Sequence, residues 1–136
     1  MSSESKKILV PVGFSDQSFN ALDQAAMFAK PIGAEVVLLS VVELNGLFKR
    51  MFSSEEKLND FKKEVTEKLQ AVADEFEERY KIKASALVAN GVVHEEISRV
   101  AELLNVELVV MGTNGKHSNN KKSVIGSNAF RVVSSV

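Results

Sequence analysis

Residues 7–13 read KILVPVG, a continuous apolar run that ends in a glycine. A run of this kind, with no alternation of apolar and polar residues, is typical of a strand buried on both faces of a parallel sheet. Residues 35–42, EVVLLSVV, form a second such run. Two strands joined by one helix make a right-handed βαβ unit, so we expect the two runs to lie parallel. A proline has no N–H group to donate, which predicts that Pro11 lies near the end of its strand, where the ladder stops.

The helix between these two strands has recognisable ends. Ser15 or Asp16 can cap its first turn, because a short polar side chain accepts hydrogen bonds from backbone N–H groups that have no partner there. Apolar residues then follow at spacings of three and four, which gives the helix one buried face. Pro31 disfavours helical geometry in the residue before it, and Gly33 can cap the carboxyl end. The sequence therefore predicts a helix that ends near Lys30.

The rest of the chain continues the alternation of helix and strand. Apolar residues at spacings of three and four from Leu58 to Tyr80 predict a long amphipathic helix. The alternating pattern of residues 82–88 indicates a half-exposed strand at a sheet edge. A third helix over residues 93–104 and a fully buried strand over residues 108–111 follow. We expect a fourth helix from Ser127 onward.

This order predicts a single α/β domain over residues 1–136, built as a doubly wound, mostly parallel sheet. The chain ends at Val136, where the last predicted helix would lead into a fifth strand. We therefore expect the fifth strand to be missing and the strand at residues 108–111 to be an unprotected edge. A shortened chain, or the first half of a tandem protein, would have such an ending.

The composition excludes several classes of protein. The formal net charge is -1, so the basic balance expected of a nucleic-acid-binding protein is absent. There is no cysteine, which excludes disulfides, thiolate catalysis and cysteine-based metal sites. We find no signal-peptide core and no apolar stretch of about 18 residues, the length that a membrane span needs. We therefore expect a cytoplasmic protein that binds neither nucleic acid nor a membrane.

A glycine-rich segment, residues 112–128, follows the last predicted strand. In an open α/β sheet, ligands bind outside the carboxyl ends of the strands, at the point where the strand order reverses. Gly112 and Gly115 let the backbone approach a ligand closely, and residues 126–128 open a helix whose first N–H groups can bind a phosphate. Lys116 and two later lysines can add positive charge. The alternatives are ordinary turn chemistry for the glycines and a solvated loop for the lysines.

Several short motifs occur together along the chain. They are Ile8–Val12, Phe14-Ser15, Ala21-Leu22, Leu39–Val41, Val109–Gly115 and Gly126-Ser127. In this combination the whole chain resembles the universal stress protein family. The resemblance implies a five-stranded parallel sheet in the order 3-2-1-4-5, a homodimer or a tandem-domain partner and, in one subfamily, ATP binding.

The resemblance also implies a nucleotide site. In the ATP-binding subfamily the glycine motif holds the phosphates and the ribose, and a residue near the end of the second strand meets the adenine through its main chain. That residue corresponds to Val41 in this sequence. The expected nucleotide-binding residues are Pro11, Val12, Gly13, Val41, Met111, Gly112, Gly115, Lys116, Gly126, Ser127 and Asn128.

Two departures from the motif concern the phosphates. Gly13 stands where ATP-binding members usually place an aspartate, so a carboxylate near the ribose, the phosphates or their metal is lost. Asp16 follows three residues later, where it is expected to cap a helix instead. The loop between Gly115 and Gly126 is one residue longer than is usual, which predicts a bulge at residues 118–120.

These observations lead to competing functions. The first is a regulatory protein that binds ATP, together with Mg²⁺, and turns it over slowly at most, because no residue is obviously placed as general base or metal ligand. The alternative is a nucleotide-free dimeric interaction module of the same fold. An ATP-pyrophosphatase-type enzyme would need adjacent glycines after the first strand, where Phe14 intervenes. His94 and His117 have simpler interpretations as a helix-surface residue and a solvated loop residue.

Overall fold

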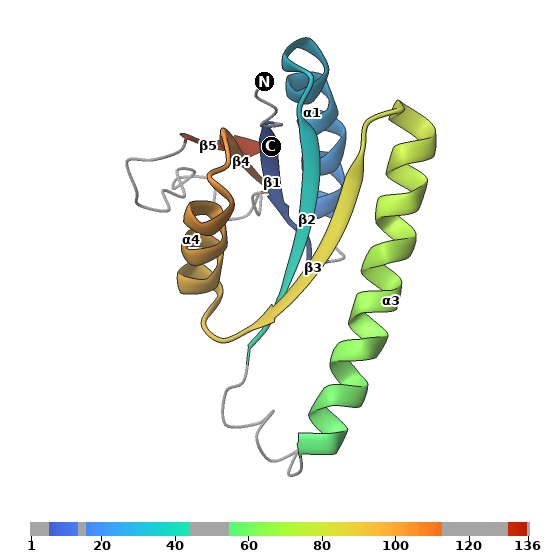
Figure 1. The fold of residues 1–136 in the computed structure, drawn as a ribbon, viewed down its shortest axis with the longest axis vertical. Helices are drawn as coiled ribbons and strands as arrows, with labels where there is room; N and C mark the ends of the chain where they lie inside the picture. Colours follow the sequence, from blue (N-terminus) through green and yellow to red (C-terminus); the bar gives the residue numbers. More distant parts are fainter. Residues whose placement is uncertain (1–5, 14–15, 44–54, 113–130, 136) are drawn as a thin grey trace.

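Strands and helices alternate along the chain. The computed structural model describes residues 6–13, 16–43, 55–112 and 131–135. In chain order its elements are β1 (Lys7–Pro11), α1 (Asp16–Ile32), β2 (Glu35–Val42), α3 (Glu55–Tyr80), β3 (Ala84–Asn90), α4 (Val93–Leu104), β4 (Leu108–Gly112) and β5 (Arg131–Ser135). Figure 1 shows the strands side by side, with the helices packed around them.

The strands form one parallel sheet in the order β3-β2-β1-β4-β5 (Figure 1). β1 is central, and Lys7 to Pro11 pair in register with Glu35 to Leu39 of β2. On its other side β1 pairs with β4. The strand order reverses at β1, because β2 and β3 lie on one side of it and β4 and β5 on the other. The predicted fold class and strand order are confirmed, and the switch point lies between β1 and β4.

The expectation of a missing fifth strand is wrong. Residues 131–135, RVVSS, form β5, which pairs in parallel with β4 from Leu108↔Arg131 to Gly112↔Ser135. β4 therefore has a strand on each side and is not the edge of the sheet. The helix predicted from Ser127 does not include residues 131–135, and Ser127 itself lies outside the described residues. A run of five residues carries little periodicity, and its extended state depends on pairing with β4, which local sequence does not reveal.

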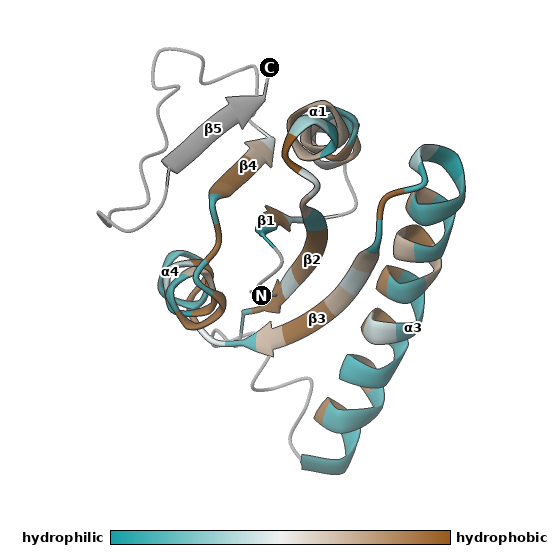
Figure 2. Cartoon of the chain, turned by 45° about the horizontal axis from the view of Figure 1, so that its top comes forward, coloured by the Kyte–Doolittle hydropathy of each residue, from teal (hydrophilic) through white to brown (hydrophobic). Residues whose placement is uncertain are grey.

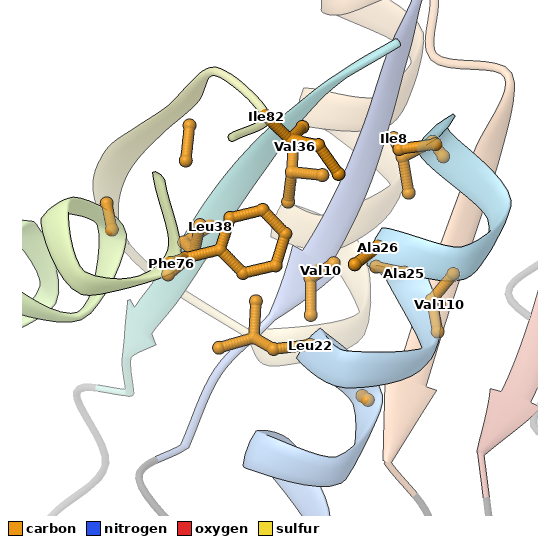
Figure 3. Close-up of a cluster of buried hydrophobic side chains, with 14 of the residues drawn as sticks. Ile8, Val10, Leu22, Ala25, Ala26, Val36, Leu38, Phe76, Ile82 and Val110 are labelled. Atoms are coloured by element: carbon orange, nitrogen blue, oxygen red, sulfur yellow. The ribbon is translucent and has the colours of Figure 1, made fainter. Parts of the chain in front are cut away.

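Helices cover both faces of the sheet, with α1 and α3 on one side and α4 on the other (Figure 2). Side chains alternate across a strand, so each inner strand feeds two cores. Val10 and Leu38 lie in the core under α1 and α3, whereas Leu9 and Leu39 lie in the core under α4. Figure 3 shows the first core, where side chains of β1, β2 and β4 meet those of α1 and Phe76 of α3.

α1 runs two residues past its predicted end at Lys30 and contains Pro31. Gly33 has a φ of 66° and donates its N–H to the carbonyl of Lys30 at 3.3 Å, while Ala34 donates to the carbonyl of Ala29 at 3.0 Å. These two bonds satisfy carbonyls of the last turn, which is the Schellman arrangement. The predicted glycine cap is confirmed. The proline removes one N–H, but the cap bonds stabilise the last turn beyond it.

The remaining elements follow the predicted pattern closely. β3 lies at one edge of the sheet, and most of its residues are half-buried or exposed, as the alternating sequence indicates. α3 is the long amphipathic helix, and it packs on β3 and β2 through Leu69, Ala73 and Phe76. Among the described helices, none is both long enough and apolar enough to cross a membrane.

Candidate functional site

The hydrogen-bond ladder between β1 and β4 ends early at the carboxyl edge of the sheet. The two strands pair over only two positions, the second of which is Leu9↔Val109. The N–H of Glu107 donates to the carbonyl of Lys7 at 2.8 Å, so the odd-numbered residues of β1 direct their main-chain groups toward β4. Pro11 belongs to this set and has no N–H to donate. The strands therefore separate at the switch point, where open α/β sheets bind ligands.

A cavity of about 240 Å³ lies at this edge, on the side of the sheet that α4 covers. Its walls come from the carboxyl ends of β1, β2 and β4 and from the first turns of α4. The lining residues are Pro11, Val12, Gly13, Leu39, Val41, Val93, Ile97, Met111 and Gly112. None of these side chains carries a charge. The described walls are thus apolar, and they suit an uncharged flat ring better than a phosphate.

The main chain of Val41 faces the cavity edge beyond the end of β1. The carbonyl of Leu39 accepts the N–H of Val12 at 2.8 Å, and the N–H of Glu35 also bonds toward β1, so the odd-numbered residues of β2 face β1. Val41 belongs to this set, but the paired region ends at Pro11. Within the described part of the chain, the N–H and carbonyl of Val41 have no strand partner on this side. As far as the described residues go, one donor and one acceptor are therefore available together at the cavity.

A buried hydroxyl joins β2 to the residue that follows β1. Ser40 is 5% exposed, and it is the one buried polar side chain among the described residues. Its Oγ donates to the carbonyl of Val12 at 2.9 Å. Sequence reasoning passed over Ser40 as part of an apolar run. The available signal was the hydroxyl itself, because a polar group among buried aliphatic side chains has to find a hydrogen-bond partner.

α4 supplies the wall opposite the strand ends. Val93 and Ile97 lie one turn apart and face the cavity. The turn before the helix is held by the N–H of Gly91, which donates to the carbonyl of Val42 at 3.0 Å. Gly91 has a φ of 147°, and a Cβ at this position would lie 3.0 Å from Oε2 of Glu96. A glycine is therefore needed here for the chain to turn from β3 into α4.

The structure brings part of the predicted site together. Pro11, Val12, Gly13, Val41, Met111 and Gly112 all line the cavity. Gly115, Lys116, Gly126, Ser127 and Asn128 lie outside the described residues, as does His117. Sequence reasoning missed Leu39, Val93 and Ile97 as lining residues. The available signal was the spacing of four between Val93 and Ile97, which places both on one face of α4. Their place beside β1 and β4 depends on how the β3–α4–β4 crossover packs.

Potential metal ligands are sparse in the described part of the chain. Across residues 6–13, 16–43, 55–112 and 131–135, no group of three or more His, Asp or Glu is placed to hold a metal ion. His94 is exposed on the first turn of α4, beside Glu95 and Glu96. Glu96 pairs instead with Arg99 at 2.7 Å. The two glutamates lie in the first turn of α4, where their negative charge interacts favourably with the positive end of the helix dipole. They supply none of the positive charge that would balance a phosphate.

Comparison with known proteins decides the family. The profile of the Universal stress protein family matches residues 4–136, which is nearly the whole chain. The chain belongs to the universal stress protein family. The resemblance inferred from the short motifs is thereby confirmed.

Sequence relatives and solved structures agree with this assignment. Universal stress protein MJ0577 of Methanocaldococcus jannaschii is 32% identical, with 94% of this chain and 88% of the relative covered. Universal stress protein MJ0531 of the same organism is also 32% identical, with 94% and 75% covered. The solved structure of MJ0577 superimposes with a TM-score of 0.65 at 27% identity and 96% coverage of both chains. A universal stress protein from Archaeoglobus fulgidus, solved in complex with dAMP, has a TM-score of 0.72 at 17% identity, with 98% and 99% covered.

Proposed function

We propose that this universal stress protein is a regulatory protein that binds an adenine nucleotide, ATP first of all, at the carboxyl edge of β1, β2 and β4. The observation that carries the proposal is the apolar cavity between these strand ends and α4. Val41 presents an N–H and a carbonyl at its edge. A purine ring offers a flat apolar surface and, along its edge, both hydrogen-bond donors and acceptors. The cavity supplies complementary groups for each.

The size of the cavity favours the base alone as its occupant. Whole ligand pockets typically measure about 300–1,000 Å³, whereas this cavity measures about 240 Å³. Its uncharged walls offer nothing to balance a triphosphate. In this proposal the ribose and phosphates therefore extend to the glycine motif, with Gly112 at its start and Gly115, Lys116, Gly126, Ser127 and Asn128 beyond it. Backbone N–H groups at glycine turns and helix starts are suited to that role.

Known ligands of related folds support an adenine nucleotide. The Archaeoglobus fulgidus universal stress protein was solved with dAMP. Another universal stress protein, with a TM-score of 0.53 at 15% identity, was solved with cAMP. These identities support the fold alone, so the assignment of residues in this chain rests on the cavity and on Val41.

Binding without rapid turnover is the form of the proposal that the lining residues favour. None of the nine lining residues has a side chain that can act as a general base or offer a carboxylate to Mg²⁺. Gly13 stands at the strand end where a carboxylate would otherwise reach the phosphates. A Mg²⁺ ion that enters with ATP is accordingly held by the nucleotide phosphates in this proposal, and the protein acts as a sensor of nucleotide.

The test is a thermal-shift titration with Mg-ATP, adenosine and ribose 5-phosphate. Because these ligands bind the native state, ATP at about a hundred times its Kd should stabilise the fold by about 2.7 kcal/mol. Adenosine should also raise the melting temperature, since it carries the base, whereas ribose 5-phosphate should have much less effect. No shift with millimolar ATP or adenosine would contradict the proposal and favour the nucleotide-free interaction module.

We also propose that the protein associates with a second copy or a tandem partner. Among the described strands β5 pairs with β4 alone, so its outer backbone groups are suited to pair with another strand. Light scattering with and without ATP measures the assembly and its dependence on nucleotide. A monomer under both conditions would contradict this part of the proposal.

A further inference from the structure

At the end of the parallel ladder between β1 and β2, a side chain takes the place of a main-chain hydrogen-bond donor. In a regular parallel ladder, the bond from Val12 N–H to the carbonyl of Leu39 would be followed by one from Val41 N–H to the carbonyl of Val12. The first of these bonds is present at 2.8 Å. In place of the second, the hydroxyl of Ser40 donates to the carbonyl of Val12 at 2.9 Å.

We propose that Ser40 is a positioning residue of the nucleotide site, whose hydroxyl satisfies the Val12 carbonyl in place of the Val41 N–H and so leaves that N–H open to the base. This inference rests on the proposed function. Ser40 does not touch the ligand itself, because its side chain lies on the sheet face opposite Leu39 and Val41, which line the cavity. It acts by ending the ladder one bond early.

Burial makes this choice of partner firm. Ser40 and Val12 are both only 5% exposed, so neither the hydroxyl nor the carbonyl can readily turn to water. A buried polar group without a partner is costly, and the Ser40–Val12 bond satisfies both groups at once. If the hydroxyl is removed, the Val12 carbonyl needs another donor, and the N–H of Val41 is the one that the parallel register supplies. The base would then compete with the protein for that N–H.

The experiment compares four proteins by amide hydrogen exchange and by adenosine and ATP affinity. They are the wild type and the variants Ser40→Ala, Ser40→Thr and Ser40→Val. Threonine and valine have the same shape and differ in the hydroxyl, so this pair separates hydrogen bonding from packing. Urea denaturation of each variant confirms that it is folded under the conditions of the binding measurement.

In the ligand-free protein, we expect the Val41 amide to exchange about tenfold more slowly in Ser40→Ala and Ser40→Val than in the wild type. The same two variants should bind adenosine and ATP about tenfold more weakly, the effect of roughly one hydrogen bond. Ser40→Thr should match the wild type within about twofold in both measurements, which a purely structural role of the side chain would not predict.

The two proposals fail differently. If Ser40→Ala and Ser40→Val bind as tightly as the wild type, or if their Val41 amide exchanges as fast, the role of Ser40 is overturned while nucleotide binding stands. If the wild type binds neither adenosine nor ATP, the proposed function fails. The contrast in Val41 exchange would then support the control of the ladder by Ser40, without a nucleotide to position.

Discussion

Truncation of two buried side chains on opposite sides of the sheet should cost different amounts of stability. Leu69 is 0% exposed in the core under α3, and Ile97 is 1% exposed in the core under α4. Truncation to alanine removes three carbon atoms from each of these side chains. At about 0.8 kcal/mol per carbon, the lost transfer free energy is about 2.4 kcal/mol for both variants.

The cavity left behind separates the two variants. Leu69→Ala opens a new void in a packed core, which brings the expected loss to about 3–5 kcal/mol. Ile97 already lines the hollow of about 240 Å³, so the space left by Ile97→Ala joins an existing opening. The loss of stability in Ile97→Ala should therefore stay near the transfer free energy, at about 2–3 kcal/mol. The difference between the variants corresponds to several degrees in melting temperature for a chain of this size.

Urea denaturation followed by circular dichroism measures both losses, and isothermal titration with adenosine measures binding. Ile97→Ala should weaken adenosine binding severalfold, because it enlarges the cavity behind the base and loosens its fit, while Leu69→Ala should leave the affinity unchanged. A loss of stability in Ile97→Ala equal to or larger than that in Leu69→Ala would refute the open hollow at α4. Equal adenosine affinity in the two variants would refute the role of Ile97 in shaping the cavity for the base.

Three further predictions concern single residues. Tyr80 is the one tyrosine of a chain without tryptophan, and its hydroxyl donates to Oδ1 of Asp23 at 2.5 Å. That bond, with some burial, raises the pKa of Tyr80 above its usual 10.0. The bond therefore contributes to the stability of the fold below pH 10, and this contribution is lost as the pH rises through the pKa of Tyr80 in the folded protein. Ultraviolet titration should give a lower pKa for Tyr80 in Asp23→Asn, and an unchanged value would contradict the assignment. Gly33→Ala should destabilise the fold by roughly 1–2 kcal/mol through its φ of 66° alone, because nothing lies within 4 Å of the added Cβ. Gly91→Ala should cost more, since its Cβ also meets Glu96, and Glu96→Ala should recover the steric part in a double-mutant cycle by urea denaturation.

Much of the site could be predicted from the sequence because of how parallel sheets are built. Buried apolar runs mark the strands, and the carboxyl ends of all parallel strands lie at one edge. Pro11, Val12, Val41 and Gly112 therefore had to come near one another once the runs were recognised. The contribution of α4 could not be obtained in this way. Val93 and Ile97 belong to a helix whose sequence gives its apolar face but not the strand ends that this face covers.

β5 and Ser40 illustrate two kinds of information that local patterns lack. RVVSS is extended because β4 offers it an edge to pair with, and that partner is distant in the sequence. Ser40 has its role because its hydroxyl meets a carbonyl 28 residues away. In both cases the deciding interaction is a hydrogen bond to a group that only the folded chain brings close.

The sequence by itself determined the α/β class, the position of most strands and helices, and the family, because periodicity and composition act locally and are written in consecutive residues. The tertiary structure decided which strand edge β5 occupies, which helix closes the cavity, and which main-chain groups of β2 have no strand partner among the described residues. Those features depend on registers between distant segments, and a shift of one residue would turn the N–H and carbonyl of Val41 from the cavity toward β3.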